Sequence, residues 1–376
     1  MGALLTVSKQ QVLRRGGLRM TELPKKPRAN SQSMTRHAKD HERWKKIVNA
    51  FPDVSITVLG DLVADEFVFG EIARVSREAP VLILKHRERS VVPGGGGNAI
   101  MNLAALGVNV LPVGVVGDDE AGHLLIEALH HKKIPTGGIQ KLKHYTTTTK
   151  TRILAGMSHN SRQQVIRVDR EPDPLEETHP ALLNLVTAAR EYATASDAFM
   201  ISDYGYGAGA PRLLTFVRSN GCLENKPVTL DSRYRMLEFD GATAATPNEP
   251  EVEEALGIRI GNDSRKLLQA GGQLMERMGL ESLVITRGRD GMVAFEREGK
   301  PENIPIFGSD QVVDVTGAGD TVIATFTAAL AAGADAVTAA RLANLAGGLV
   351  VMKRGTATVS AKELLGAIDQ YAAAHG

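Results

Sequence analysis

The segment DVTGAGDTVIATF, residues 314–326, contains residue types that suit phosphoryl transfer. Residues 317–319 are glycine, alanine and glycine, and they stand directly before an apolar run with helical spacing. A helix that starts here would present free backbone N–H groups and the positive end of its dipole to an anion. Asp320 adds a negative charge at the same place, which is explained if it takes the proton of a hydroxyl group that attacks a phosphoryl group. It is equally explained as a carboxylate that only complements the helix dipole.

A second glycine-rich segment, PGGGGNA at residues 93–99, also leads into a predicted helix. Consecutive glycines let a backbone approach a polyol closely, and Asn98 is then available to hydroxyl groups. The alternative is a tight turn that needs positive φ angles. The segment lacks the strand–glycine–helix context of a dinucleotide fingerprint, and the sequence contains no Walker A pattern.

Alternating strands and helices must position these residues. Such alternation predicts a mostly parallel sheet that is covered by helices on both faces. Val312, Val313 and Val315 predict a further strand end directly before the glycine turn. The other predicted strands are 54–61, 108–119, 150–156, 163–170, 197–205, 226–232 and 241–248, with a hairpin at 281–296, and the predicted helices are 98–107, 121–134, 178–195, 319–332 and 335–353.

Polar residues gather at the ends of the predicted strands. Ligands of parallel sheets bind outside the carboxyl ends of the strands, so these residues are candidates for one shared site. They are Asp61, Asp203, Asp231, Asn248 and Thr286.

Residues 65–95 interrupt the alternation with short β-like stretches that have no helices between them. We expect a small sheet inserted into the main domain. It would either cover the site as a lid or form a dimer contact.

Charge is distributed unevenly along the chain. Residues 1–46 carry 12 Lys/Arg and 3 Asp/Glu, whereas the remainder carries 32 and 40, so the net charge of +1 combines a basic leader with an acidic body. We expect residues 1–38 to be disordered, as a targeting segment or a flexible extension, and residues 39–376 to form one α/β domain. The acidic body predicts no nucleic-acid surface.

Cysteine content and hydropathy limit the class of protein further. The single cysteine, Cys222, excludes an intramolecular disulfide framework and a multi-cysteine zinc site. No apolar run reaches the roughly 18 residues that a membrane span requires. These features predict a cytoplasmic protein.

Three elements, PGGGGNA, TPNEPE and DVTGAGD, together resemble the ribokinase, or PfkB, superfamily of sugar kinases. Other stretches are similar to the heptose-7-phosphate kinases that form the kinase half of ADP-heptose synthase, and the similarity extends over residues 40–366. They are VLGDLVADEFVFGEIARVSREAPV, TKTRILAG, RQQVIRVDRE, ISDYGYG and GTATVS. The resemblance implies a ribokinase-like three-layer α/β/α sandwich with a mostly parallel sheet and a small β-sheet lid.

The resemblance implies catalytic roles at the glycine turn. The aspartate would deprotonate the anomeric hydroxyl of the sugar, and the three preceding backbone N–H groups would stabilise charge on the transferred phosphate. Beside this anion hole, Asp314 and Thr316 would hold a monovalent cation such as K⁺. The implied catalytic residues are Asp320, Gly317, Ala318 and Gly319.

The resemblance also implies two sets of binding residues. Asn248 and Glu251 match the N-x-x-E element, which positions Mg²⁺ and the triphosphate, with Mg²⁺ held through water. The implied ATP-binding residues are Asn248, Glu249, Pro250, Glu251, Thr286, Arg287, Gly288 and, near adenine, Asn344. The implied sugar-binding residues are Asp61, Gly95, Gly96, Asn98, Asp203 and Arg233.

Two positions depart from the pattern of these kinases. Tyr206 stands where S-D-Y-G-K-G has its lysine, and Arg233 stands where the lysine of D-P-K is usual. Tyrosine has no ammonium to meet a phosphate, whereas Arg233 replaces part of a lysine's charge. We therefore expect the distal phosphate of the substrate to bind differently, or the preferred sugar to differ. No H-x-G-H element occurs before Gly376, so we expect a separate protein to supply the adenylyltransferase step.

We predict an ATP- and Mg²⁺-dependent kinase that acts on the anomeric hydroxyl of D-glycero-D-manno-heptose 7-phosphate and forms the 1,7-bisphosphate, a precursor of ADP-heptose and lipopolysaccharide. Its partners would be the sugar phosphate, ATP and a second copy bound through the lid. One alternative is a PfkB-type kinase of another sugar, sugar phosphate or nucleoside. The other is a catalytically idle protein that senses a sugar or nucleotide.

Overall fold

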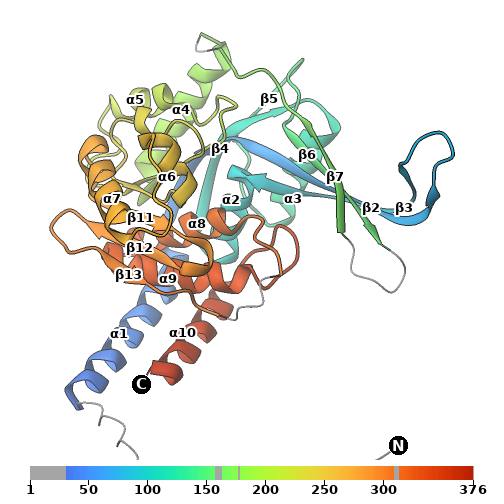
Figure 1. The fold of residues 1–376 in the computed structure, drawn as a ribbon. Coiled ribbons are helices and arrows are strands. Elements are labelled where there is room, and N and C mark those ends of the chain that lie inside the picture. The colour runs from blue at the N-terminus through green and yellow to red at the C-terminus, as the bar shows by residue number, and fades with distance from the viewer. Residues whose placement is uncertain (1–30, 157–162, 177, 309–312, 376) are drawn as a thin grey trace, which may run out of the picture.

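The computed structural model describes residues 31–156, 163–176, 178–308 and 313–375 (Figure 1). The first 30 residues of the expected leader therefore lie outside the described part. Helix α1 (Ser31–Asn49) begins inside the segment that we expected to be leader. It lies along the carboxyl-terminal helix α10 (Ala361–His375), where the Trp44 and Tyr371 rings are 5.5 Å apart.

A nine-stranded sheet forms the centre of the domain, in the order β13-β12-β11-β10-β9-β8-β1-β4-β5. The strands from β5 to β11 in this order pair in parallel, and β12 and β13 join one edge antiparallel. The bounds are β1 (Ser55–Gly60), β4 (Asn109–Gly117), β5 (Gly138–Leu142), β8 (Ala198–Asp203), β9 (Val228–Ser232), β10 (Ala244–Ala245), β11 (Ser282–Thr286), β12 (Met292–Glu296) and β13 (Glu302–Ile304).

Helices cover both faces of this sheet and enclose two hydrophobic cores (Figure 1). Because strand side chains alternate between faces, Ile56 and Val58 of β1 belong to one core and Leu59 to the other. The first core includes α2 (Gly96–Ala105), α3 (Glu120–His131), α8 (Ala318–Ala331) and α9 (Ala336–Val350). The second includes α4 (Pro180–Ala195), α5 (Pro211–Arg218), α6 (Glu249–Leu256) and α7 (Ser264–Met278). The three-layer α/β/α fold is confirmed.

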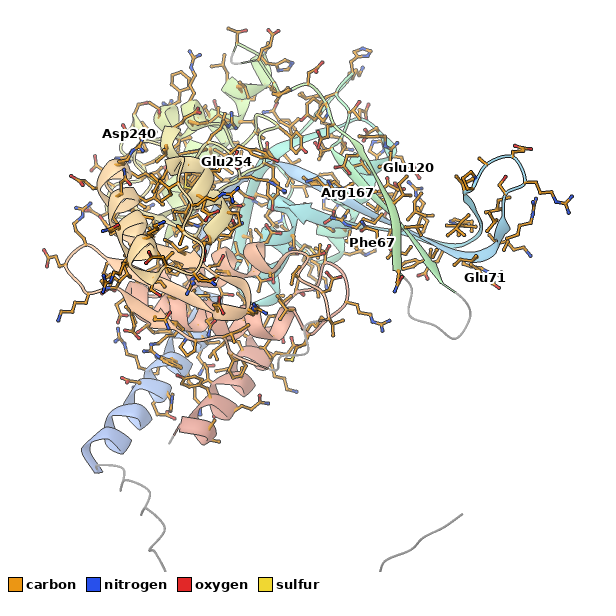
Figure 2. All side chains as sticks on the ribbon, in the orientation of Figure 1. Phe67, Glu71, Glu120, Arg167, Asp240 and Glu254 are labelled. Carbon is orange, nitrogen blue, oxygen red and sulfur yellow. The ribbon has the colours of Figure 1, made fainter. Side chains whose placement is uncertain are left out.

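A separate four-stranded sheet, the lid, projects from one side of the domain (Figure 1). Its strands are β2 (Leu62–Val75), β3 (Leu82–Gly95), β6 (Thr149–Gly156) and β7 (Gln163–Arg170), in the order β3-β2-β6-β7. The prediction of a small inserted sheet at 65–95 is correct but incomplete, because β6 and β7 also belong to it. Figure 2 shows the labelled lid residues Phe67 and Arg167 nearer the domain than Glu71.

The strand predicted directly before the glycine turn is wrong for the described residues of that segment. The backbone N–H groups of Val313 and Asp314 both donate to the carbonyl of Val351, at the end of α9, and so pair with no strand. Val313 and Val315 are also exposed, at 52% and 67%. Val312 lies outside the described residues.

Two further predictions concern the length of one strand and membrane-spanning helices. Strand β10 has only two residues, although 241–248 was predicted as a strand. In the described part of the chain, no helix is both long enough and apolar enough to cross a membrane.

Candidate active site

The start of helix α8 is open to solvent on one side. Gly317 precedes the helix with φ +77°, and a Cβ atom there would collide with the side-chain amide of Asn98. A Cβ atom on Gly319 would meet no atom within 4 Å. The Ala318 N–H donates to the carbonyl of Val315 at 3.2 Å. The N–H groups of Gly317 and Gly319 are therefore the candidates for binding an anion at this helix start.

Asp320 lies in this first turn and is 5% exposed. One carboxylate oxygen accepts a hydrogen bond from Asn98 Nδ2 at 2.8 Å, and the other accepts one from the Tyr204 hydroxyl at 3.0 Å. Burial raises the pKa of Asp320 to about 7, although these two hydrogen bonds oppose the shift. A carboxyl group with this pKa can accept a proton near neutral pH, which a group that only complements the helix dipole need not do.

Asn98 is itself held in place by the two helices that meet at this point. Asn98 is 1% exposed, and its side-chain amide also donates to the carbonyl of Gly317 at 3.4 Å. Asn102 donates to the Asn98 side-chain oxygen at 3.2 Å, and the Thr321 hydroxyl donates to Asn102 at 3.0 Å. The predicted sugar-binding role of Asn98 stays a prediction, and the structure shows that its side chain also bonds to Asp320.

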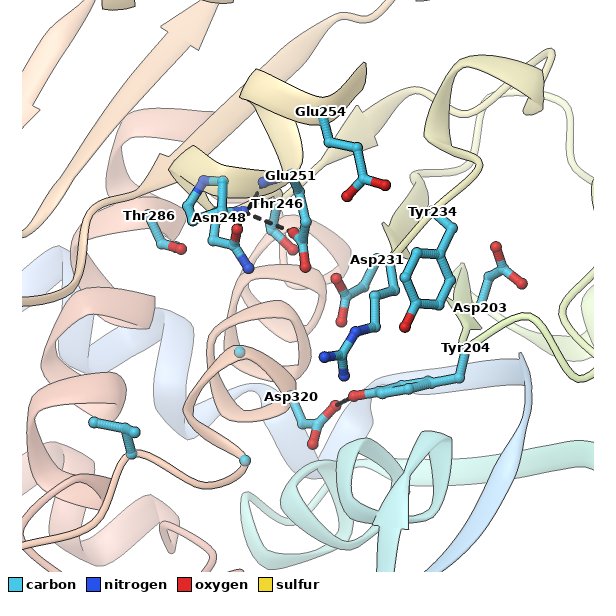
Figure 3. A pocket seen from close by; sticks show the side chains of 15 residues that line it. Asp203, Tyr204, Asp231, Tyr234, Thr246, Asn248, Glu251, Glu254, Thr286 and Asp320 are labelled. Atoms are coloured by element: carbon cyan, nitrogen blue, oxygen red, sulfur yellow. Dashed lines mark hydrogen bonds between the residues drawn. The ribbon is translucent and has the colours of Figure 1, made fainter. Parts of the chain in front are cut away.

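A polar cavity of about 620 Å³ opens in front of Asp320 (Figure 3). It lies at the carboxyl ends of β8, β9 and β11 and at the starts of α6 and α8, as expected for a parallel sheet. The residues that line it are Asp203, Tyr204, Asp231, Arg233, Tyr234, Thr246, Asn248, Pro250, Glu251, Glu254, Thr286, Val315, Gly317, Gly319 and Asp320.

A second, mostly apolar cavity of about 180 Å³ adjoins the first. The two share Thr286, Val315 and Gly319, so they form one continuous cleft across the start of α8. The predicted ATP-binding residues Gly288 and Asn344 line the apolar part, and Asn344 Nδ2 donates to the carbonyl of Pro305 at 2.8 Å. An apolar slot beside a polar chamber suits a flat ring that is attached to a charged chain.

The N-x-x-E element forms a capping box at the start of α6. Asn248 Oδ1 accepts from the Glu251 N–H at 2.9 Å, and the Glu251 carboxylate accepts from the Asn248 N–H at 2.8 Å. The same residues line the polar cavity together with Pro250. Glu249 instead pairs with Arg287 at 3.0 Å, and neither of these two lines the polar cavity.

Acidic side chains concentrate opposite Asp320. Burial raises the pKa of Asp231 well above its usual range, and the charges of Glu251 and Asp320 add to the shift. Burial likewise raises the pKa of Glu251. Three carboxyl groups on one polar cavity, all with raised pKa values, would be stabilised as anions by a divalent cation between them. Among the described residues, however, no group of three or more His, Cys, Asp or Glu is arranged to hold a metal ion by itself.

Asp61 and Asp203 are less accessible than the sequence suggested. The Asp61 carboxylate accepts four backbone N–H groups, from Tyr204, Tyr206, Ala208 and Gly209, at 2.8 to 3.3 Å. It does not line the polar cavity and anchors the loop that carries Tyr204. For Asp61, this arrangement disagrees with the expected direct contact to a sugar, because its lone pairs are already used.

Asp203 does line the cavity, but its carboxylate is also engaged. It pairs with Arg235 and accepts from the Ser232 hydroxyl at 2.7 Å. Figure 3 shows the Asp203 carboxylate turned away from Asp320. A sugar-binding role for Asp203 stays a prediction.

Gly95 and Gly96 do not line the polar cavity. Gly95 has φ +54° and lies against the Tyr204 ring, and a Cβ atom on Gly96 would lie 3.0 Å from the carbonyl oxygen of Asp61. These glycines let β3 and α2 pack closely against the end of β1. The tight-turn alternative therefore has direct structural support at this segment.

Asp314 and Thr316, the predicted cation ligands, form a turn before α8. The Asp314 carboxylate accepts from the N–H groups of Thr316 and Gly355, both at 2.9 Å. Burial alone would raise the pKa of Asp314, but these hydrogen bonds hold it below its usual range. An ionised carboxylate next to the anion-binding turn is compatible with a bound cation, whose presence stays a prediction.

Two residues of the site went unassigned in the sequence. Tyr204 was overlooked although it lies in the stretch ISDYGYG, and Asp231 was noted at a strand end but given no role. The signal available for Tyr204 was its position one residue after the end of β8. Its bond to Asp320, 116 residues away, follows only from the fold.

Comparison with known proteins agrees with this geometry. The model of the pfkB family carbohydrate kinases matches residues 60–363. The bifunctional protein HldE of Pelobacter propionicus is 38% identical over 332 residues, which are 88% of this chain and 66% of that protein. The HldE protein of Geobacter metallireducens is 39% identical over 343 residues, 91% of this chain and 66% of that protein. The chain thus spans slightly less than two thirds of the length of these curated relatives.

Solved structures show the same fold. Ribokinase of Arabidopsis thaliana, complexed with ribose and ATP, matches with a TM-score of 0.64 and 20% identity, over 84% of this chain and 98% of that one. Phosphofructokinase-2 of Escherichia coli, in complex with potassium, matches with a TM-score of 0.66 and 15% identity, over 85% and 99%. At these identities the likeness concerns the ribokinase-like fold alone.

Proposed function

The chain belongs to the pfkB family of carbohydrate kinases, phosphotransferases that act on a sugar hydroxyl, and from this premise we propose its substrate and its mechanism. We propose that it transfers the γ-phosphoryl group of ATP to the anomeric hydroxyl of D-glycero-D-manno-heptose 7-phosphate and forms the 1,7-bisphosphate. The similarity to HldE proteins supports this choice of substrate over other sugars.

Asp320 at the open start of α8 is the observation that carries the proposal. Its carboxylate accepts the proton of the sugar hydroxyl as that oxygen attacks the γ-phosphorus, the bond from this phosphorus to the bridging oxygen breaks, and ADP leaves. The N–H groups of Gly317 and Gly319 receive the charge that develops on the transferred phosphoryl group, and the Ala318 N–H would join them on leaving the Val315 carbonyl. Both carboxylate oxygens now accept hydrogen bonds, so the incoming hydroxyl takes the place of the Tyr204 hydroxyl or shares the same oxygen.

Each of the two connected cavities would hold one part of the nucleotide. The adenine ring would lie in the apolar cavity beside Asn344, and the phosphates would extend past Thr286 toward Gly319. Asp231 and Glu251 are suited to hold Mg²⁺ through water, since buried carboxylates with raised pKa values gain from a nearby cation. The ion would neutralise charge on the phosphate oxygens. K⁺ beside Asp314 and Thr316 is a further proposal of the same kind.

Two alternatives compete with this proposal, and only the second belongs to another class of protein. A kinase of another sugar, sugar phosphate or nucleoside would use the same catalytic turn with a different acceptor. An idle sensor would bind ligands without turnover, and it is disfavoured because the base, its two hydrogen-bond donors and the open helix start are all present together.

Release of ADP across a panel of acceptors tests the proposal. The panel contains heptose 7-phosphate, unphosphorylated heptose, fructose 6-phosphate, ribose and adenosine, each with ATP and Mg²⁺. We expect the highest kcat/KM with heptose 7-phosphate. A higher value with any other acceptor would replace the substrate, and turnover with none would support the sensor.

The lid carries exposed apolar side chains that support a homodimer. Val165, Ile166 and Val168 of β7 are 46%, 54% and 47% exposed, and Val75 and Leu82 on β2 and β3 are exposed as well. We propose that a second copy covers this surface. Sedimentation should show a dimer for the parent and a monomer for Ile166→Lys, and a monomeric parent would contradict the proposed homodimer.

A cytoplasmic location stays a prediction.

A further inference from the structure

Tyr206, at the position where related kinases carry a lysine, does not line the polar cavity. Its hydroxyl donates to the Glu171 carboxylate at 2.5 Å, beyond the end of lid strand β7. The structure therefore places no cation at this position of the loop. A phosphate at the far end of the sugar must meet positive charge from other residues, or the site does not select for it.

Lys150 of lid strand β6 lies over Tyr204, a residue of the cavity wall. Its ammonium nitrogen lies 5.4 Å from the centre of the Tyr204 ring, while the hydroxyl of the same tyrosine bonds to Asp320. Lys150 and the proposed base therefore contact the same tyrosine side chain, the lysine over its ring and the carboxylate at its hydroxyl.

The lid arginines near Lys150 are paired with carboxylates, whereas Lys150 has no salt bridge to any described residue. The pairs are Arg152–Asp65, Arg167–Asp169, Arg170–Glu66 and Arg89–Glu66. Burial lowers the pKa of Lys150, and the positive charge of Arg233 lowers it further. Two cations that disfavour one another across a polar cavity are stabilised when an anion enters between them.

Arg233 contributes the second cation from the body of the domain. It follows β9, lines the polar cavity with Tyr204, and has no salt bridge within the described ranges. Its guanidinium lies 5.6 Å from the ring centre of Tyr234, another residue of the cavity wall. Lys150 and Arg233 therefore approach the same space from the lid and from the sheet.

We propose that Lys150 and Arg233 together form the subsite for the distal phosphate of the sugar, with Tyr204 alongside the sugar between this subsite and Asp320. This inference rests on the proposed function, because it assumes that the acceptor is a sugar phosphate. The lid then contributes charge to substrate selection as well as covering the site. A guanidinium can bond two phosphate oxygens at once, and the ammonium adds a second fixed charge.

Substitution of the two cations separates this subsite from other roles. Lys150→Met and Arg233→Ala should each raise KM for heptose 7-phosphate about ten- to a hundred-fold, as for a lost charge-assisted hydrogen bond of roughly 1.5–3 kcal/mol. KM for ATP should change far less, and kcat/KM for unphosphorylated heptose should fall much less than kcat/KM for heptose 7-phosphate. Lys150→Arg should restore most of the loss. Lys85→Met, an exposed lysine on lid strand β3, is the matched control and should change neither constant.

Each other result overturns the inference in a recognisable way. If Lys150→Met lowers kcat for both sugars equally, the lysine acts on the transferred phosphoryl group and the subsite is wrong, while the proposed substrate stands. If KM for heptose 7-phosphate is unchanged in both variants, the phosphate binds elsewhere. If the parent prefers unphosphorylated heptose, the proposed substrate and the subsite both fail, and membership of the kinase family is unaffected.

Discussion

Two glycine-rich segments lead into helices at the candidate active site, and they differ in what surrounds their glycines. At the start of α2, a Cβ atom on Gly94 would collide with the Asp65 carboxylate, and one on Gly97 would lie 3.0 Å from Pro93. At the start of α8, a Cβ atom on Gly319 would meet nothing within 4 Å. The first segment is packed, whereas the second is packed at Gly317, against the Asn98 amide, and open at Gly319.

The difference shows that a glycine-rich helix start indicates an anion site only when its N–H groups stay accessible. The glycines before α2 let β3 approach β1 and place Asn98 under Asp320. Gly319, in the first turn of α8, leaves room for a phosphoryl group. The first segment carries the asparagine that bonds to Asp320, and the second is where we propose that the reaction takes place.

The largest expected effect is that of Asp320→Asn. Loss of the general base should lower kcat by at least ~10²-fold with heptose 7-phosphate, while KM for ATP changes little. The substitution should lower activity but raise the stability of the folded protein at high pH. Since burial raises the folded pKa from 3.8 to about 7, the parent loses stability as pH rises through this interval, and the variant does not. Thermal denaturation should therefore show Asp320→Asn above the parent at pH 8 and equal to it at pH 4.

A pair of alanine substitutions compares the two glycine segments directly. Gly94→Ala should cost ~1–3 kcal/mol of unfolding free energy, because its methyl group overlaps an Asp65 side chain that Arg152 holds in place. Gly319→Ala should keep or raise stability by up to ~1 kcal/mol, since alanine favours a helix. Its methyl group would nevertheless enter the cavity, and kcat should fall about ten-fold or more, short of the ~10²–10³ for a lost donor.

Urea unfolding and steady-state kinetics of both variants measure this contrast. Equal losses of stability would mean that the start of α8 is packed as tightly as that of α2. Unchanged turnover in Gly319→Ala would mean that the open turn is not where the phosphoryl group lies.

Tyr204→Phe should shift the pH dependence rather than abolish activity. The base must be deprotonated, so kcat/KM of the parent should fall as pH drops through about 7. The Tyr204 hydroxyl bonds to the carboxylate and lowers its pKa, so its removal should move this limb to higher pH by ~0.4–1 unit, equivalent to a hydrogen bond of ~0.5–1.5 kcal/mol. A shift to lower pH, or none, would show that Tyr204 does not act on Asp320.

The smallest expected effect concerns the start of α6, where the side chains of Asn248 and Glu251 cap the backbone N–H groups. Asn248→Ala removes the cap and should cost ~0.5–2 kcal/mol of unfolding free energy. Asn248→Asp keeps an acceptor for the Glu251 N–H and is the matched control. If KM for ATP rises in both variants, the amide contacts the nucleotide; if it rises only in the alanine variant, the residue acts through the helix start.

Local patterns predicted much of the fold. The strand that ends at Gly60 and the helix that starts at Ala318 follow from hydrophobic periodicity and from glycine, and both were predicted close to their observed bounds. Helix α7 was missed, although Leu267, Ala270, Leu274 and Met278 recur at helical spacing. Val313 and Val315 were misassigned because β-branched residues suit strands, whereas here the carbonyl of Val351 takes the local N–H groups.

The site was predictable as a set of residue types but not as a set of contacts. Asp320 was identified from its own segment, because a carboxylate at an anion-binding turn is unusual. The contact of Asn98 with Asp320 joins residues 222 positions apart, and the role proposed for Lys150 depends on its position over the Tyr204 ring. Asp61 shows that a strand-end carboxylate can bond to backbone N–H groups, a contact that its position in the sequence did not indicate, and its sugar-binding role stays a prediction.

Phosphorus-31 NMR of the reaction products tests most directly whether Asp320 at the open start of α8 makes this chain an anomeric sugar kinase. The parent, with ATP, Mg²⁺ and heptose 7-phosphate, should give ADP and a new signal from a phosphate on the anomeric carbon. Asp320→Asn, which should still bind ATP, should give neither over the same period. An anomeric phosphate formed at a comparable rate by the variant would contradict the central claim, as would a parent that forms ADP and inorganic phosphate alone.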